Sequence, residues 1–575
     1  MGLIDSALQV GRSALLSYQS ALQVIGNNIS NAGSADYTRQ TPGLTPLVGA
    51  VTPEGMRPGA GVALTSLKRN LDEGLENRIR AAIGNNQSLD ARRRTLGMVE
   101  SLFDPLTGLQ LQDKLTDFFN TLNEVQNAPA DVATRGLTVA SAASLAGTLR
   151  EMRSRLTDLG NDLNEEIGAL VTQADGLAER IAQLNTDIVA AESSGAPANP
   201  LRDQRDAVVR ELSEIVEVSV RVHPDGSFNV YVGNENIVQG GVSRGLTRVS
   251  RLDGDFRRDG VAFADTNAQV ALRGGRLEGL IKARDEDAFG RITDIDRLAA
   301  AIIFEVNKIH ADGQGLVGFT TVVSSYAVAD PTAALNSSDT GLPFTPTNGS
   351  FYLSVTDDNN GTTTSYQIEV DLDGIDDDTT LESLAADINA TVAGVTASVT
   401  LDNRLSLAAD SGLSFTFGHD GQSQRPDTSG LLAALGVNTL FKGSTAADIA
   451  VNETVESRPA LFAAAAVNLS GDGANAGRLI AVSDAPSDLL EGASMVDFFG
   501  QVADAVAVRS ASARDGADAS TSVLGSLRAQ KENISGVSLD EEAIELIKFE
   551  RAFQGAARFV SVVDRLTNEM LALVR

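Results

Sequence analysis

The chain has 575 residues, of which 42% are apolar, so it is long enough to form several domains with cores of their own. Its formal charge of −30, from 46 basic and 76 acidic residues, argues against binding to nucleic acid or to an anionic membrane surface. Cysteine is absent and the only histidines are His223, His310 and His419, which excludes disulfide scaffolds, zinc–thiolate sites and iron–sulfur clusters.

The first residues predict an amphipathic helix rather than a targeting segment. They include Asp5 and no basic stretch, which argues against a cleaved secretory signal, and the chain has no run of 18 apolar residues that could span a bilayer. Over residues 1–31 the spacing of three and four is that of a heptad seam. Its members are Ile4, Leu8, Gly11, Leu15, Tyr18, Leu22, Ile25 and Ile29.

The composition of residues 41–61 predicts an extended linker, because this stretch contains four prolines and five glycines. Residues 62–312 then read as mostly helical. The longest run, from Leu149 to Ile188, keeps the three-and-four spacing with one stutter and would form a rod of roughly 60 Å. Alternating β-branched residues at about 216–275 predict a small β region, and helix returns from Leu277 to His310.

Residues 320–450 predict a different kind of domain, with short strands separated by Asp, Asn, Gly and Thr. This stretch has 17 acidic and 3 basic residues, a net charge of −14, as expected for a solvent-exposed insertion. Residues 455–575 read as helical again, and Ser538–Glu541 has the pattern of a capping box at the start of the last helix. The seam of that helix comprises Leu546, Phe549, Phe553, Ala556, Val560, Val563, Thr567, Met570 and Val574.

These patterns predict a mainly α fold with inserted β structure: a long antiparallel helical bundle, terminal coiled-coil helices and a β-rich inserted domain. We expect three domains: residues 1–45 with 536–575 for assembly, residues 46–319 with 451–535 as the bundle, and residues 320–450 as the acidic outer domain. The two ends would lie side by side. Burial of one narrow apolar seam offsets little of the entropy that the backbone loses when a long helix becomes ordered. We therefore expect the ends of the chain to become ordered on assembly.

Catalytic and metal-binding motifs occur only in the wrong context. Gly313–Gly318 matches G-x-G-x-x-G but follows a helix, and Gly241–Gly245 matches G-x-S-x-G but precedes no helix. The acidic cluster of Asp371, Asp373, Asp376, Asp377 and Asp378 lacks the register of an EF-hand, and a solvated acidic turn is the default interpretation. We therefore expect no catalytic residue, no cofactor and no metal, and satisfied surface or core roles for the histidines.

Both ends of the chain resemble the bacterial flagellar rod, hook and hook-associated family. At the N-terminus the resemblance rests on Asn28-Ile-Ser-Asn31 followed by Tyr37, and at the C-terminus on the stretch SGVSLDEEAIELIKFERAFQGAARFVSVVDRL. Tyr37-Thr-Arg39-Gln40 looks like the hook-associated variant. The stretches NPLRDQRDAVVRELSEIVEVSVRVHPDGSFNVYV and DTSGLLAALGVNTLFKGSTAADIAVNE are similar to internal parts of hook-associated members. Asp36 departs from the family, which usually has Gly before the Tyr.

The resemblance implies a structural protein that joins the hook to the filament outside the cell and buffers their two lattices. The family is exported through the flagellar type III channel with an uncleaved signal, and its terminal helices form an inner coiled-coil tube. The implied partners are further copies of the chain in a ring, the hook protein, a second junction protein and an export chaperone at the C-terminal helix. Alternatives are another axial subunit of hook or filament type, a surface adhesin acting through residues 320–450, and a secreted enzyme.

The assembly contacts are expected at the two seams and at the turn from Asn28 to Gln40. The predicted interface residues are Ile4, Leu8, Leu15, Tyr18, Leu22, Ile25, Ile29, Asn28, Asn31, Tyr37, Arg39, Gln40, Leu546, Phe549, Phe553, Val560, Val563 and Met570.

Overall fold

The computed structural model describes residues 2–34, 36–49, 59–104, 108–193, 195–375, 377–467, 469 and 471–573, without the side chains of residues 2–4, 571 and 573. The chain forms two compact units. Unit 1 comprises Met1–Arg93, Leu163–Lys282 and Ser512–Arg575, and unit 2 comprises Arg94–Asp162 and Ala283–Ala511. The fold is mainly helical with several small antiparallel sheets, as the sequence predicts. No helix of the described residues is both long enough and apolar enough to cross a membrane.

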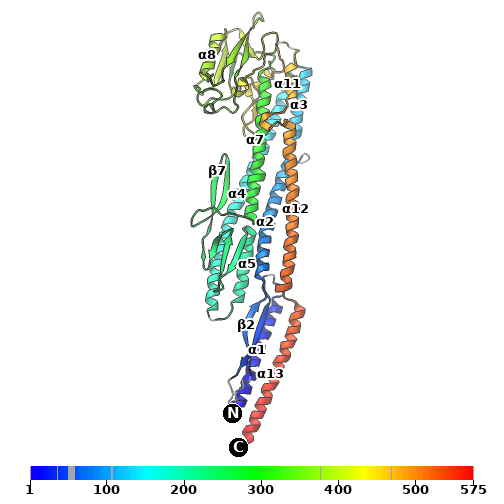
Figure 1. Cartoon of the computed structure of the whole chain (residues 1–575). Helices are drawn as coiled ribbons and strands as arrows, with labels where there is room; N and C mark the ends of the chain where they lie inside the picture. The colour runs from blue at the N-terminus through cyan, green and yellow to red at the C-terminus, as the bar shows by residue number, and fades with distance from the viewer. Residues whose placement is uncertain are drawn as a thin grey trace. The chain divides into compact units, whose positions relative to one another are not determined.

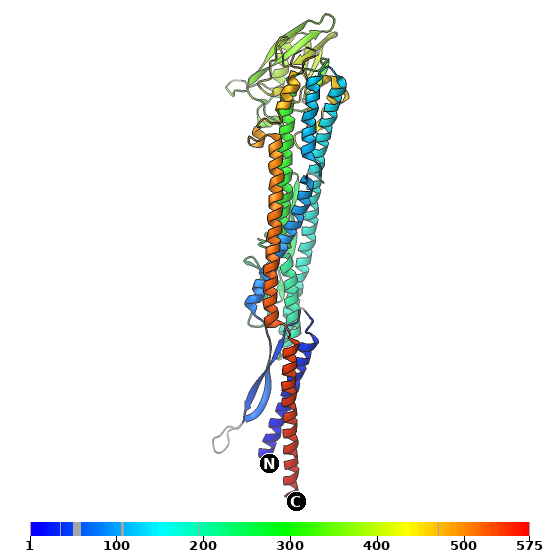
Figure 2. The ribbon, with the colours of Figure 1, turned by 90° about the vertical axis from the view of Figure 1, so that its right-hand side faces the viewer.

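Unit 1 contains the two helices from the ends of the chain. The helices α1 (Gly2–Ser30) and α13 (Leu539–Leu573) lie side by side and antiparallel (Figure 1). A hairpin of β1 (Gln40–Val48) and β2 (Gly59–Arg69) packs against α1, and the view in Figure 2 shows it beside the helix pair. The serine hydroxyl of Ser17 on α1 donates to the carbonyl of Val62 at 2.9 Å. The helices from the two ends therefore meet, as the terminal seams predict.

The prediction of an extended linker at residues 41–61 is wrong where the structure describes it. The strand β1 pairs antiparallel with β2 from Gln40 opposite Arg69 to Val48 opposite Gly59, with shifts of register after Gly43 and after Leu47. Proline is tolerated in such a hairpin because both strands are edge strands, and Pro42 and Pro46 lie opposite Leu67 and Val62. The amino-acid composition gave the wrong prediction because it counts prolines and glycines without regard to the positions that they take in a strand. Residues 50–58 of the predicted linker lie outside the described part of the chain.

The body of unit 1 is built on long helices and a small β region. The run from Leu149 to Ile188 lies within α4 (Val132–Glu192), which belongs to unit 1 from Leu163 onward, and all its seam residues except the half-buried Leu159 are buried. The predicted β region forms a four-stranded sheet and a separate hairpin. The remaining elements are α5 (Asn199–Ile215), β3 (Val218–Val222), β4 (Phe228–Val232), β5 (Glu235–Gln239), β6 (Val242–Ser243), β7 (Leu246–Asp253), β8 (Phe256–Phe263), α6 (Arg276–Lys282) and parts of α2 (Glu73–Phe103) and α12 (Met495–Ser535).

Unit 2 combines helices with the acidic β-rich segment. Two three-stranded antiparallel sheets, β11 (Thr363–Val370), β10 (Gly349–Asp357), β14 (Leu413–Phe417) and β12 (Val395–Val399), β13 (Leu405–Ala409), β9 (Thr321–Val323), enclose an apolar core that includes Phe351, Leu407 and Phe415. The helix predicted from Leu277 to His310 is present without a break, and it contains a π-helical turn (Ala283–Ala288) between α6 and α7 (Phe289–Ala311). Two further strands are β15 (Phe441–Lys442) and β16 (Ala450–Val451). The other helices are α3 (Leu111–Asn127), α8 (Leu381–Thr391), α9 (Leu431–Leu435), α10 (Glu453–Ser457) and α11 (Ala474–Ala481), with short 3₁₀ turns at Ser338–Thr340, Pro459–Leu461 and Asp488–Leu490.

The prediction of helical structure for residues 455–575 needs correction in its first part. Between α10 and the start of α12 at Met495 the described residues form only short helices joined by loops. Proline at positions 459 and 486 and glycine at 471 and 473 interrupt the helical pattern there. From Met495 onward the described chain is helical except for a short break before Leu539.

Candidate assembly site

The antiparallel pairing of α1 and α13 depends on small and aromatic residues at the contact. Gly11 lies so close to α13 that a Cβ atom there would overlap Val560, and it would lie 3.2 Å from Cδ1 of Phe559. Further along, the rings of Tyr18 and Phe549 pack with their centroids 6.2 Å apart. The glycine therefore allows a close helix approach that a larger side chain would prevent.

Most predicted seam residues are only partly covered by this pairing. On α1, Ile25 is buried, whereas Leu8, Leu15, Tyr18, Leu22 and Ile29 are half-buried. On α13, Val563 is buried, Leu546, Phe549, Phe553 and Val560 are half-buried, and Met570 is 50% exposed. The side chain of Ile4 and residue Val574 lie outside the described part of the structure. The two helices thus leave apolar surface on both seams.

A second apolar row runs along α13, which the sequence reasoning did not identify. This outer row consists of Ile544, Ile547, Val562 and Leu566, whose exposed fractions are 67%, 50%, 44% and 50%. A helix with apolar residues on more than one face is typical of a helix that is covered from several sides. Exposed apolar rows of this kind mark surfaces for protein contacts.

The residues from Tyr37 to Gln40 form a turn after α1 that connects this helix to its neighbours. The hydroxyl of Tyr37 donates to Oδ1 of Asn28 at 2.8 Å, and that oxygen also accepts the backbone N–H of Gln40 at 3.1 Å. Thr38 is buried, and its hydroxyl accepts from Nη2 of Arg69 at 3.3 Å. The side-chain oxygen of Gln40 accepts from Nδ2 of Asn199 on α5 at 3.0 Å. This Tyr37–Gln40 turn thereby fixes the end of α1 against β2 and α5.

Arg39 links the same turn to α12 and α13. Its backbone N–H donates to the carbonyl of Ser535 at 3.0 Å, at the end of α12. Its guanidinium donates from Nε to Glu542 at 2.7 Å and from Nη1 to Glu541 at 2.6 Å. Glu542 is buried and also accepts from Nδ2 of Asn28 at 2.9 Å. The start of α13 is therefore held by two side chains that come from the other end of the chain.

Burial and neighbouring charges shift the pKa values of several groups in this network. Burial, together with the nearby carboxylates of Asp203 and Glu542, raises the pKa of Tyr37 to about 12, so its hydroxyl stays protonated and donates to Asn28. Partial burial acts to lower the pKa of Arg39, but its hydrogen bonds and charge interactions with Glu541 and Glu542 outweigh this effect and raise it. Burial raises the pKa of Asp203, against the attraction of Arg69.

Four of the predicted turn residues meet in this network and one does not. Asn28, Tyr37, Arg39 and Gln40 are brought together, whereas Asn31 is exposed and its side chain donates to the carbonyl of Asn27 at 2.8 Å, at the end of α1. Asp36 departs from the family pattern. Its backbone does not adopt the left-handed conformation, and its side chain forms an ion pair with Arg210. The substitution therefore leaves the turn intact.

Several residues of the network were not singled out from the sequence. The sequence identifies Glu541 only as part of a capping box, and it assigns no role to Glu542, Arg69, Asn199, Asp203 or Asp206. Arg69 pairs with Asp203 at 2.8 Å and with Asp206. Two patterns in the sequence could have pointed to these residues. One is the pair of acidic residues that follows Ser538, and the other is the NPLRDQRD stretch, in which charged residues alternate with the apolar positions of a helix.

The other motifs occupy structural positions. The glycines of Gly313–Gly318 follow the end of α7, and Gly241–Gly245 includes the short strand β6 and is followed by β7 rather than by a helix, as expected. Asp373 and Asp378 accept backbone N–H groups of Ile375 and Gly374 in an acidic turn, and Asp376 lies outside the described residues. His310 and His419 are buried and hydrogen-bonded, and His223 is exposed beside Asp225.

Comparison with known families gives two matches. The family described as the flagellar hook-associated protein FlgK helical domain matches residues 96–321. The family described as the flagellar basal body rod FlgEFG protein C-terminal matches residues 530–573, which include α13 and its first-turn acids. The first match includes the stretch that begins NPLRDQRD, and the second includes the C-terminal stretch on which the sequence resemblance rests.

Individual proteins are similar over almost the whole chain. The flagellar hook-associated protein 1 of Escherichia coli (strain K12) is 27% identical, over 99% of this chain and 100% of that protein. The protein of the same name from Bacillus subtilis (strain 168) is 23% identical, over 98% and 97%. The solved structure of the flagellar hook junction protein FlgK from Burkholderia pseudomallei covers 80% of this chain and 100% of its own, with a TM-score of 0.50 and 18% identity, and supports the fold.

Proposed function

Because the chain belongs to the flagellar hook-associated protein 1 family, we propose that it forms the junction between hook and filament. It is a structural protein of the bacterial flagellum, not an enzyme, and it assembles with other axial components of that extracellular structure. The observation that carries the junction proposal is the similarity to hook-associated protein 1 along the whole length of the chain.

The terminal helices and the Tyr37–Gln40 turn supply the contacts between copies in this proposal. The half-open seams of α1 and α13 and the outer row on α13 give the pair apolar surface in several directions. The ion pairs of Arg39 orient that pair on its own chain. A junction of this design buffers two lattices, because neighbouring copies pack through the terminal helices and through bundle faces. The acidic segment 320–450 faces outward, where its charge keeps it solvated.

The partners follow from the same proposal. The chain forms a ring with copies of itself, with the hook protein on one side and a second junction protein on the other. Export through the flagellar type III channel precedes assembly, and a chaperone covers α13 beforehand. The exposure of the outer row and of Met570 supports this last step, since an uncovered apolar helix is prone to aggregate.

Deletion of the gene tests the junction proposal. Electron microscopy of the deletion strain is expected to show hooks without filaments, with filament subunit released into the medium and detectable by immunoblot. A plasmid copy of the gene should restore filaments. Cells that lack hooks as well would place the protein in the rod or hook. Normal filaments would overturn the proposal and direct attention to the segment 320–450 as a binding module.

Charge substitutions in the seams test the role of the terminal helices. We expect Leu22→Asp and Phe553→Asp each to abolish motility while circular dichroism retains the helical signal of the bundle, because a carboxylate in a half-buried seam opposes helix packing. Gln19→Asp and Gln554→Asp are matched controls at exposed positions of the same helices. Loss of bundle helicity in the seam variants, or equal loss of motility in the controls, would contradict the assignment.

A further inference from the structure

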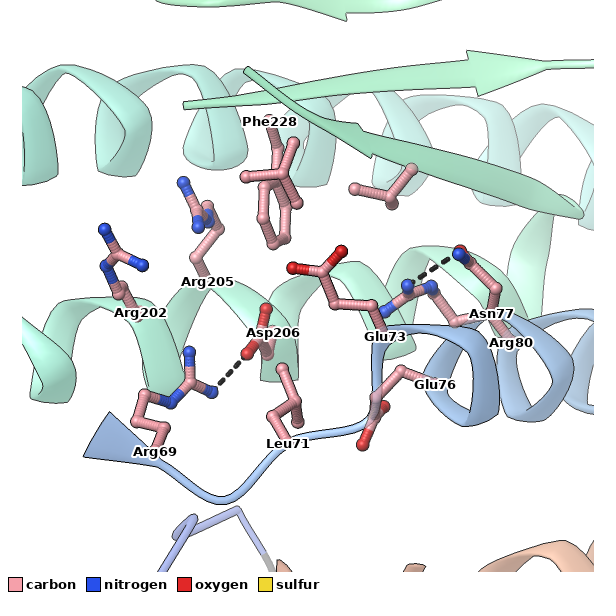
Figure 3. Close-up of a pocket in the computed structure, with 12 residues that line it drawn as sticks. Arg69, Leu71, Glu73, Glu76, Asn77, Arg80, Arg202, Arg205, Asp206 and Phe228 are labelled. Carbon is pink, nitrogen blue, oxygen red and sulfur yellow. Dashed lines mark hydrogen bonds and ion pairs between the residues drawn. The ribbon is translucent and has the colours of Figure 1, made fainter. Parts of the chain in front are cut away.

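A small pocket in unit 1 collects four arginines near the beginning of α2. It has a volume of about 60 Å³ and lies between α2, α5 and the strands β3 and β4 (Figure 3). Its charged lining consists of Arg69, Arg80, Arg202, Arg205, Glu73, Glu76 and Asp206. Apolar walls come from Leu71, Val220, Val222 and Phe228.

Two of the four arginines are neutralised by carboxylates. Arg69 pairs with Asp203 at 2.8 Å and with Asp206, an interaction visible in Figure 3. Arg202 donates from Nε and Nη2 to the two oxygens of Glu192 at 2.7 and 2.6 Å. Glu76, the buried acid of α2, pairs with Lys531 at 2.9 Å. These carboxylates therefore already have cationic partners.

The other two guanidiniums are buried with neutral partners. Arg205 is 1% exposed, donates from Nη1 to Oδ1 of Asn185 and to the carbonyl of Gly226, both at 2.8 Å, and stacks 3.4 Å above the Phe228 ring. Arg80 is 4% exposed and donates to Oδ1 of Asn77 at 2.8 Å. Within the described residues neither one makes an ion pair, and the Nε atoms of Arg69, Arg80 and Arg205 are buried without hydrogen-bond partners.

Two buried cations facing one pocket are costly unless an anion joins them. Burial lowers the pKa of Arg205 to about 10 and also lowers that of Arg80, which reflects this cost. The one carboxylate of the lining without an ion pair, Glu73, belongs to an exposed residue at the rim. The nearby carboxylates act to raise the pKa of both groups, those of Glu76, Asp206 and Glu73 for Arg80 and that of Asp206 for Arg205, but burial outweighs this attraction.

We propose that this pocket, between Arg80 and Arg205, binds a small oxyanion of the phosphate or sulfate class. Guanidinium groups present parallel N–H donors that match the oxygens of such anions, and the unpartnered Nε atoms supply donors beyond those in use. The bound anion connects the first turns of α2 to α5 and to the strand that carries Phe228. This ligand stabilises unit 1 next to the Tyr37–Gln40 turn and is independent of the junction proposal.

Calorimetric titration of the full chain with inorganic phosphate and with sulfate, at constant ionic strength, tests the site. We expect saturable binding of one anion per chain and a higher melting temperature in its presence. Arg80→Gln should weaken the affinity by at least about tenfold, because it removes one of the two cations. Arg78→Gln, at an exposed position of the same helix outside the pocket, is the matched control and should bind as the parent chain does.

Glu73→Gln provides a test that does not disturb a buried residue. It removes the competing carboxylate at the rim, so the affinity for phosphate should rise severalfold, whether or not Arg80→Gln folds. Absence of saturable binding of either anion would overturn the proposal. Equal weakening by Arg78→Gln, or unchanged affinity in Glu73→Gln, would overturn it as well, since binding would then be a non-specific effect of surface charge.

Discussion

Replacement of Glu542 by alanine is expected to separate the two ends of the chain. The carboxylate is buried, accepts from Arg39 and Asn28, and lies in the first turn of α13, where a negative charge is favoured by the helix dipole. Its removal leaves Glu541 as the only carboxylate that accepts from Arg39 in this network. It also removes an acceptor from Nδ2 of Asn28 and leaves a cavity where the glutamate side chain was. We expect the pairing of α1 with α13 to lose about 3 kcal/mol, the lower end of the range for a broken buried ion pair.

Hydrogen exchange read by mass spectrometry measures this loss directly. Peptides from α1 and α13 should exchange about 100-fold faster in Glu542→Ala than in the parent chain, since 1.4 kcal/mol corresponds to a factor of ten. Glu541→Ala is the matched control, because it removes a neighbouring carboxylate that bonds the same arginine but is 61% exposed. An exposed pair contributes less than about 1 kcal/mol. Equal effects of the two variants would show that burial of Glu542 does not matter.

The contrast between these two glutamates illustrates what the sequence could reveal. Both are first-turn acids behind Ser538, whose hydroxyl accepts the backbone N–H of Glu541 at 3.4 Å, and the sequence predicts this helix start. Nothing local distinguishes a buried carboxylate from an exposed one at adjacent positions. The distinction arises from Asn28 and Arg39, more than 500 residues away along the chain.

Helices with a regular period were predictable and pairing between distant segments was not. The seam from Leu149 to Ile188 specifies one buried face, and the structure buries it. The sequence did not predict the hairpin of β1 and β2 because its strands contain proline and show little alternation of polar and apolar residues. Its stability comes from pairing with α1, through hydrogen bonds of Ser13 and Ser17 to the backbone of β2. The turn residues Asn28, Tyr37, Arg39 and Gln40 were found through family resemblance, while their partners on α5 depend on tertiary contacts.

Acid is expected to destabilise unit 2 through two buried histidines. The Nδ1 atom of His310 lies 2.8 Å from the carbonyl of Asn438, and its Nε2 accepts the backbone N–H of Ala463 at 3.1 Å. His419 accepts the backbone N–H of Gly421 through Nδ1 at 3.0 Å, and its Nε2 lies 2.9 Å from the Thr416 hydroxyl. In each ring one nitrogen accepts an N–H group, so a second ring proton would break a hydrogen bond.

Burial lowers the pKa of both histidines from 6.5 to about 4, with Arg135 contributing to the shift of His310. The unfolded chain therefore binds more protons than the folded chain between these values, and the free energy of unfolding falls as the pH falls. Between pH 7 and pH 5 each histidine costs about 2 kcal/mol. Burial raises the pKa of Asp312 to about 6, which favours the folded state in acid and offsets about 1 kcal/mol. Asp427, whose pKa burial also raises, acts in the same direction.

The third histidine of the chain supplies the control for this effect. His419→Asn retains an acceptor for Gly421 but has no ring to protonate, so it should be less stable than the parent at pH 7 and lose about 2 kcal/mol less on transfer to pH 5. His223→Asn, at a half-exposed side chain beside Asp225, should keep the full pH dependence. Hydrogen exchange of peptides from residues 405–440, corrected for intrinsic rates at each pH, measures the difference. An unchanged pH dependence in His419→Asn would mean that its neutral ring does not control the acid stability of unit 2.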